Sequence, residues 1–120
     1  MAALKKRYLP VCLRDNLGVL ARVPLASGFL TGKYQRGVSF PPGDYRGKQS
    51  QESLDAKADQ AAEILRKEVP EGVNMAAWAI AWCLKHDAVA CVIPGARNAA
   101  QLRANASASE LADGNHPLSM

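Results

Sequence analysis

The chain has 120 residues, of which 48% are hydrophobic and 22% are charged, and this composition is typical of one globular domain. No apolar run approaches the ~20 residues that a transmembrane helix needs, and residues 1–16 lack the long apolar core of a signal peptide. The net charge is only +4 and aromatic residues make up 6%, which disfavours nucleic-acid binding, because that function needs a larger basic face or stacking aromatics.

The first predicted elements are an amphipathic helix over 2–14 and a short strand over 18–23. Leu4 and Tyr8 share the apolar face of the helix. Pro10 either splits this helix or marks a later start, because proline lacks the N–H that a helix interior requires. The strand consists of small and β-branched residues and is short enough to be buried.

A turn rich in glycine and hydroxyl residues, LASGFLTGKY, follows this strand. It ends at Lys33, and small residues with a lysine just after a strand suit a phosphate-facing turn. The alternative is an ordinary Gly/Ser loop. Residues 35–49 then carry no hydrophobic periodicity and many glycines, prolines and charges. A loop of this length in a compact domain is usually a lid, a binding loop or disordered.

Two helices are predicted next, over 51–68 and 74–86. Ser50 or Ser53 caps the first, whose apolar stripe has spacings of four, three and four residues. The second is apolar on nearly every side, which predicts burial against several neighbours. We expect the two helices to touch through Leu65, Ile80 and Leu84.

The last strand, predicted over 89–93, runs through a Pro-Gly turn into a helix over 98–111. Asn98 and Gln101 form an Asn-x-x-Gln version of the capping box at the start of this helix. Free N–H groups and the helix dipole favour an anion at such a junction, and Arg97 adds a charge that suits a phosphate monoester. The alternative is that this turn, like most strand-to-helix turns, binds nothing.

The alternation of strands and helices predicts an α/β fold with parallel strand pairing. The two candidate anion-binding turns both follow strands. They are therefore expected at the same edge of the sheet, beyond the carboxyl ends of the strands, where ligands of α/β folds bind.

The cysteine pattern indicates neither a disulfide framework nor a metal site. The three cysteines are widely spaced without a C-x-x-C pair, and the two histidines are not spaced with them as metal ligands. Such cysteines favour a reducing compartment, so we expect a cytoplasmic protein.

Two stretches, VLARVPLASGFLTGKY and AWAIAWCLKHDAVACVIPGARNAAQLRANASAS, together resemble the C-terminal part of aldo-keto reductases. The match covers nearly all of residues 4–112, in the order and spacing of that family. The resemblance implies a partial (β/α)8 TIM barrel that comprises about its last two strands and last helices. It also implies NADPH binding and the reduction of aldehydes or ketones by hydride transfer. Residues 1–120 are then the cofactor-binding C-terminal part of such a barrel, with a frayed tail at 113–120.

The family's cofactor contacts carry over to this chain residue by residue. Arg22 takes the place of a side chain, often aromatic, that packs on the nicotinamide face. Lys33 and Arg46 match basic residues of a loop that closes over the cofactor. The turn that holds the adenosine 2′-phosphate, and so favours NADPH over NADH, matches Gly95, Ala96 and Arg97. The shelf under the pyrophosphate matches Val23, Pro24, Leu25, Ala26 and Ser27. Residues beside the adenine ring and ribose match Gln101 and Asn105.

The catalytic residues of the family have no counterpart in this chain. The resemblance assigns the chemistry to an Asp, a Tyr, a Lys and a His from the earlier part of the barrel, with the Tyr as general acid. A TIM barrel takes ~250 residues, so we expect a fragment: a truncated gene, a mis-started reading frame or one half of a split enzyme. The residues of matching type that sit in no matching motif are Tyr8, Tyr34, Tyr45, His86 and His116.

The sequence leaves three hypotheses about function. The first is the cofactor-binding part of an aldo-keto reductase, inactive alone, which acts on a small carbonyl substrate only when an N-terminal half completes it. The second is a non-catalytic binding or assembly subunit that docks on a separate N-terminal half. The third is a structural remnant without a ligand.

Overall fold

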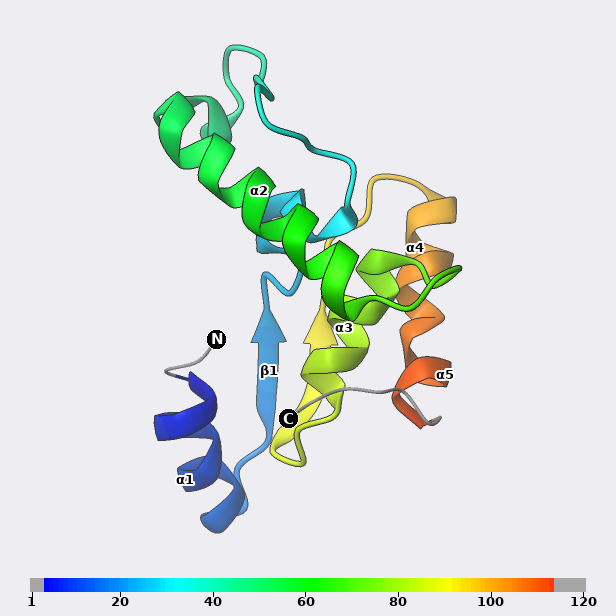
Figure 1. Cartoon of the computed structure of the whole chain (residues 1–120). Coiled ribbons are helices and arrows are strands. Elements are labelled where there is room, and N and C mark those ends of the chain that lie inside the picture. The colour runs from blue at the N-terminus through cyan, green and yellow to red at the C-terminus, as the bar shows by residue number, and fades with distance from the viewer. Residues whose placement is uncertain (1–3, 114–120) are drawn as a thin grey trace.

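The computed structural model describes residues 4–113 and arranges helices around a small parallel sheet (Figure 1). Helix α2 lies against the segment that follows β1, α3 packs on β2, and α4 and α5 both pack on α3. The elements in chain order are a π-helical turn at Leu4–Tyr8, α1 at Leu9–Arg14, β1 at Val19–Arg22, a 3₁₀ segment at Ala26–Thr31, a 3₁₀ turn at Tyr45–Lys48, α2 at Gln51–Glu68, α3 at Met75–Leu84, β2 at Val89–Ile93, α4 at Ala99–Ala106 and α5 at Ala108–Asp113.

Strands β1 and β2 pair in parallel, as the sequence predicts, and form a two-stranded sheet within the described residues. Leu20 is aligned with Cys91 and Arg22 with Ile93, after an irregularity in the register that follows Val19. Parallel pairing brings the carboxyl ends of both strands to one edge, so the turns that follow them are neighbours. Apolar side chains of the sheet remain open, because Leu20 is 63% and Ile93 52% exposed. Parallel strands are ordinarily covered on both faces.

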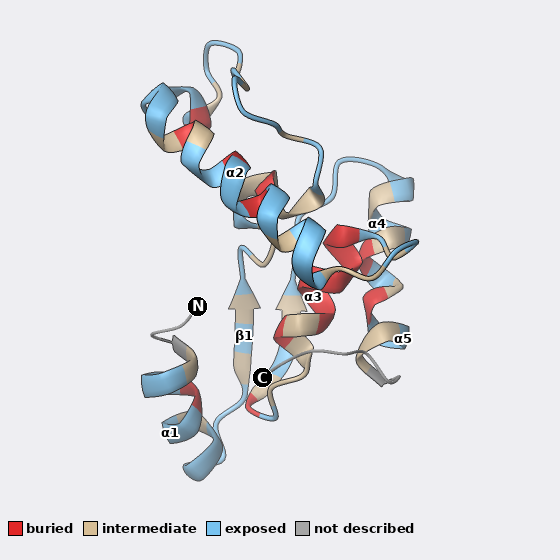
Figure 2. Cartoon of the chain, viewed as in Figure 1, coloured by how far each residue is buried: buried red, intermediate tan, exposed pale blue. Residues whose placement is uncertain are grey.

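Two hydrophobic clusters hold the described residues together. The first lies between α2 and the 3₁₀ segment after β1, and the second lies where α3 meets α5. Burial is concentrated along α3 (Figure 2), which confirms the prediction from its apolar sequence. Its alanines allow neighbouring backbones to approach closely. The first cluster consists of Phe29, Leu54, Ala58, Ala61 and Met75, and the second of Ala77, Ile80, Ala81 and Ala108.

The contact between α2 and α3 differs from the predicted one. Ile80 belongs to the second cluster and Leu84 packs against it, whereas Leu65 is 40% exposed and belongs to neither cluster. Ala61 shares the first cluster with Met75, which is the first residue of α3. Helix α2 therefore meets the beginning of α3 instead of packing along its length.

The first and last predicted helices are each divided in two. Pro10 lies in the first turn of α1, just after the π-helical turn, where its missing N–H is not needed. Between α4 and α5, the Ser107 hydroxyl donates to the carbonyl of Ala104 at 2.7 Å. This bond competes for the carbonyl that a continuous helix would offer to the N–H of Ala108. Of the predicted frayed tail 113–120, only Asp113, at the end of α5, lies inside the described residues.

The helix caps follow the sequence. Ser50 Oγ accepts a hydrogen bond from the Ser53 N–H at 3.2 Å, and Asn74 Oδ1 accepts from the Ala77 N–H at 3.0 Å. No helix in the described part of the chain is long and apolar enough to cross a membrane. The cytoplasmic location stays a prediction.

Candidate functional site

An open groove of about 940 Å³ lies at the edge where β1 and β2 end. Its walls include most residues of the turn after β1 (residues 23–28, the shelf turn), residues 43–46 of the long loop, and residues 95–97 of the turn between β2 and α4 (residues 94–98). In the described part of the chain, twelve of the thirteen predicted cofactor contacts line this groove, and Ala26 does not. The twelve are Arg22, Val23, Pro24, Leu25, Ser27, Lys33, Arg46, Gly95, Ala96, Arg97, Gln101 and Asn105. Their role toward a cofactor stays a prediction.

The shelf turn carries backbone strain. Val23, Ala26 and Ser27 have positive φ angles of 54°, 48° and 59°, and Gly28 follows with 92°. A β-branched residue such as Val23 rarely adopts this conformation, so the surrounding structure must hold it there. Within the turn, the Ala26 N–H donates to the carbonyl of Val23 at 3.2 Å, and the Gly28 N–H donates to the carbonyl of Leu25 at 3.0 Å. The result is a fixed backbone shape at the end of a strand.

Side-chain amides hold the turn between β2 and α4. Asn98 Oδ1 accepts from the Gln101 N–H at 2.9 Å, which confirms half of the predicted capping box. The other half differs, because Gln101 Oε1 accepts from the N–H of Arg97, at 2.7 Å. Asn105 is buried, and its Nδ2 donates to the carbonyl of Gly95 at 3.1 Å. Two residues predicted beside the adenosine thus also fix the shape of the turn.

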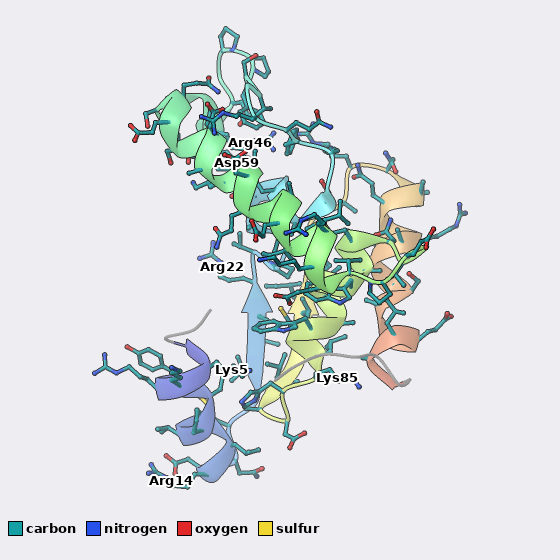
Figure 3. The ribbon with its side chains drawn as sticks, in the orientation of Figure 1. Lys5, Arg14, Arg22, Arg46, Asp59 and Lys85 are labelled. Carbon is teal, nitrogen blue, oxygen red and sulfur yellow. The ribbon has the colours of Figure 1, made fainter. Side chains whose placement is uncertain are left out.

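Exposed cationic side chains from three segments line the groove. Arg22 ends β1 and lies near its carboxyl end (Figure 3), and Arg97 directly precedes the N-cap of α4. Lys33 lies just past the 3₁₀ segment, with its ammonium nitrogen 5.2 Å from the centroid of the Tyr34 ring. The N-terminus of α4 adds partial positive charge. This distribution suits a ligand with several negative charges.

Arg46 has a partner that the sequence analysis did not foresee. It is 8% exposed, and its Nε and Nη2 donate to the two carboxylate oxygens of Asp44 at 3.0 and 2.7 Å. Its Nη1 donates to the carbonyl of Ser27 and to the hydroxyl of Tyr34, both at 3.0 Å. The hydrogen bonds from the Arg46 side chain are the main cause that lowers the pKa of Asp44 to about 2, and Asp44 raises the pKa of Arg46. The Asp-x-Arg spacing of residues 44–46 is the feature of the sequence from which this ion pair could have been predicted.

Three aromatic side chains form a cluster that packs against the Arg46 side of this ion pair. The guanidinium carbon of Arg46 lies 4.1 Å from the centroid of the Phe40 ring, a stacking distance. Phe40 in turn packs on Tyr34 and Phe29, at centroid distances of 5.2 and 6.3 Å. The long loop is therefore anchored to the shelf turn by aromatic packing and by one buried cation, which the absence of periodicity in its sequence did not reveal.

A second cavity, of about 260 Å³, lies between α1, β1 and α3. Its walls are mainly apolar, and the Lys5 ammonium lies 5.6 Å from the centroid of the Trp82 ring at its border. Among the predicted cofactor contacts only Arg22 reaches it within the described residues. Across residues 4–113, no group of three or more His, Cys, Asp or Glu side chains could hold a metal ion.

Comparisons with known proteins point to one family. A family model described as "Aldo/keto reductase family" matches residues 3–114. A "Probable voltage-gated potassium channel subunit beta" of Arabidopsis thaliana is 32% identical over 90% of this chain and 34% of its own length. An "L-glyceraldehyde 3-phosphate reductase" of Escherichia coli is 34% identical over 87% of this chain and 32% of its own length.

A more distant relative and a solved structure agree. The Schizosaccharomyces pombe protein named "Aldo-keto reductase yakc [NADP(+)]" is 26% identical over 81% of this chain and 29% of its own length. A glycerol dehydrogenase of Gluconobacter oxydans superposes with a TM-score of 0.56 at 23% identity, over 98% of this chain and 42% of that one. This likeness shows the fold, an α/β unit that matches part of a larger structure. The chain spans about a third of the length of the curated relatives it matches.

Proposed function

The chain belongs to the aldo/keto reductase family, and from this premise we propose that it forms the NADPH-binding C-terminal part of a (β/α)8-barrel reductase. In such an enzyme NADPH supplies the hydride that reduces an aldehyde or ketone. The part proposed here binds and orients that cofactor. The catalytic acid belongs to other strands of the barrel, because no tyrosine of this chain sits in the family's catalytic motif.

The observation that carries this proposal is the convergence of the predicted contacts on one groove. Two turns that are far apart in the sequence meet at the carboxyl ends of parallel strands, the edge at which α/β barrels bind ligands. One turn has a strained, fixed backbone and the other precedes a capped helix. Both shapes are suited to phosphate groups, since backbone N–H groups and the helix dipole favour anions.

Each exposed cation has a proposed task. Arg97, beside the N-terminus of α4, pairs with the 2′-phosphate of NADPH through charge-assisted hydrogen bonds. Lys33 and the shelf turn bind the pyrophosphate. Arg22 covers the nicotinamide face, where it replaces the aromatic side chain common in the family. Gln101 and Asn105 shape the adenosine end of the groove while they hold the turn.

The exposed strand faces support the barrel part of the proposal. Leu20 and Ile93 are more than half exposed, although they belong to parallel strands. In a closed barrel the interior side chains of such strands are covered by the remaining strands. Further barrel strands, from the same polypeptide or from a separate one, would bury these side chains and complete the substrate site.

A non-catalytic binding subunit is the second candidate. The relative from Arabidopsis thaliana bears the name of a potassium channel subunit, which shows that a protein matching this chain can be named for assembly and not for catalysis. Carbonyl-dependent oxidation of NADPH, followed by the absorbance of the reduced nicotinamide, separates the two functions. We expect none from this chain alone.

Calorimetric titration with NADPH and NADH tests the cofactor site. Arg97→Ala should lose about 1.5–3 kcal/mol for NADPH, or one to two decades in affinity, and almost nothing for NADH, which lacks the 2′-phosphate. Lys33→Ala should weaken both. Arg103→Ala is the matched control, because Arg103 is an exposed arginine of α4 that does not line the groove.

Two results would count against the proposal. Equal losses for both cofactors in Arg97→Ala would withdraw the preference for NADPH. No binding of either cofactor to the unmodified chain would favour a structural remnant over a cofactor-binding part.

A further inference from the structure

All three side-chain nitrogens of Arg46, a cation of the groove, already donate hydrogen bonds to other protein groups. Its planar fork points Nε and Nη2 at the two oxygens of Asp44, at 3.0 and 2.7 Å. This is the bidentate geometry with which an arginine grips a carboxylate or a phosphate. Nη1 is held by Ser27 and Tyr34, so the side of the guanidinium that would meet a phosphate is the side that Asp44 occupies.

We propose that the Asp44 carboxylate is an internal stand-in for a phosphate group of the dinucleotide, and that the ligand displaces it from Arg46 on binding. This inference rests on the proposed function of the groove and adds a regulatory element to it. The free groove is self-inhibited, because one of its anion sites is filled by the protein's own acid. In the bound groove, Arg46 donates its hydrogen bonds to a phosphate of the ligand, and the Asp44 side chain points into solvent.

The burial of the pair explains why the site must always hold an anion. The side chains of Arg46 and Asp44 are only 10% and 13% exposed. A guanidinium left alone at such a site is strongly unfavourable, whereas exchanging one anion for another keeps it compensated. Both residues line the groove, so an incoming phosphate can reach the fork. A carboxylate that leaves it passes into open solvent.

The segment that carries Asp44 borders open space. Gly43 directly precedes it, has a φ of 92°, and has no atom within 4 Å of the place where a Cβ would lie. On the other side, Asp44 Oδ1 accepts from the Arg46 N–H at 2.9 Å, a local bond that water can replace. The Asp44 backbone itself is held, because its N–H donates to the Pro41 carbonyl at 3.1 Å and its carbonyl accepts from the Gly47 N–H at 3.0 Å. Rotation of the Asp44 side chain alone would therefore free the fork of Arg46, and the aromatic cluster of Phe29, Tyr34 and Phe40 would stay in place.

The charge pattern of the groove supports the same conclusion. Among the described residues that line the groove, Asp44 is the only acidic one, beside Arg22, Lys33, Arg46 and Arg97. Arg97 contributes to the lowered pKa of Asp44 as well. The carboxylate therefore reduces the attraction that both Arg46 and Arg97 have for an anion. A negative charge at this position weakens the binding of phosphate to the free groove, as an internal competitor would.

Asp44→Asn is the decisive variant, because it keeps the size of the side chain and the oxygen that accepts from the Arg46 N–H. It removes the charge that competes with the ligand. The proposal expects NADPH and inorganic pyrophosphate to bind roughly tenfold more tightly, since the anion no longer has to displace an internal competitor. A purely structural latch predicts the opposite, a loss of affinity. Asp59→Asn is the matched control, because Asp59 pairs with Arg36 on the exposed surface and lies outside the groove lining.

A double-mutant cycle separates displacement from simple repulsion. The gain from Asp44→Asn should fall at least threefold in an Arg46→Gln background, because the freed fork is then absent. An equal gain in both backgrounds would show that Asp44 only repels the ligand and would overturn the proposal. If Asp44→Asn fails to fold, the unmodified protein still gives an answer. Pyrophosphate should shift the Nε–H resonance of Arg46 in NMR spectra, and an unchanged resonance at saturating pyrophosphate would overturn the proposal.

The outcomes distinguish this inference from the proposed function. If the unmodified chain binds NADPH and Asp44→Asn gains no affinity, the displacement is wrong and the function stands. If Asp44→Asn gains pyrophosphate affinity and neither protein binds NADPH, the displacement stands and the dinucleotide function is wrong.

Discussion

Replacing Gly28 by alanine should destabilise the shelf turn through a collision that the structure locates. A Cβ at residue 28 would lie 3.1 Å from Cε2 of Tyr34 and 3.3 Å from Nη1 of Arg46. Neither neighbour can easily yield. The Tyr34 ring packs between Phe29 and Phe40, at centroid distances of 5.5 and 5.2 Å, and Nη1 is held by two hydrogen bonds of 3.0 Å.

The magnitude follows from comparison with Gly43, which has the same φ of 92° but nothing within 4 Å of its would-be Cβ. Alanine in this conformation costs about 1–2 kcal/mol at either position. Overpacking against a rigid neighbour adds about 1–3 kcal/mol at Gly28 alone. We expect Gly28→Ala to lower the free energy of unfolding by about 2–5 kcal/mol and Gly43→Ala by about 1–2 kcal/mol.

Urea denaturation followed by far-ultraviolet circular dichroism measures both values, and equal denaturant slopes establish that the free energies are comparable. The reasoning would be refuted if the two variants were destabilised equally. That result would mean that Tyr34 and Arg46 relax around the added methyl group, and that the aromatic cluster does not hold the shelf turn rigidly.

Two further predictions concern the cluster and the ion pair. Phe29→Ala, at a side chain only 2% exposed, should lower the free energy of unfolding by about 3–5 kcal/mol. Leu102→Ala, at 62% exposure, should change it by less than about 0.5 kcal/mol in the same urea titration. The pKa of Asp44 is about 2 in the folded chain and roughly 3.9 in the unfolded chain, so its ion pair stabilises fully above the unfolded value and is lost as the pH falls toward 2. The stability difference between the unmodified chain and Asp44→Asn should therefore shrink from pH 5 to pH ~2, and a difference that is independent of pH would contradict the assigned pKa.

Local signals in the sequence were sufficient for the architecture around the groove. Val89 to Ile93 is a short run of small and β-branched residues, and it forms the predicted strand. Asn74 and Asn98 start helices because a side-chain oxygen accepts a backbone N–H within three residues, a requirement that is readable in the sequence. Parallel pairing follows from the alternation of strands and helices, and with it the meeting of the two turns at one edge.

Contacts between distant segments could not be predicted in the same way. Arg46 was assigned by resemblance to the cofactor loop, and its bonds to Ser27 and Tyr34 join positions 19 and 12 residues away in the sequence. Leu65 fits the helical stripe of α2 as well as Ala61 does, but α2 meets only the beginning of α3 and leaves Leu65 40% exposed. The direction of approach between helices decides which end of a stripe is buried, and periodicity does not contain that direction.

The location of both tryptophans on α3 gives the protein a built-in optical probe of a single helix. Trp78 is buried at 5% exposure, whereas Trp82 is partly accessible and lies beside the Lys5 ammonium at the wall of the 260 Å³ cavity. The other end of the same helix carries Ala76, which lines the groove. Quenching of the emission by acrylamide should therefore affect Trp82 first, and a rise in quenching without loss of helical signal would report that the π-helical turn carrying Lys5 has moved away from Trp82.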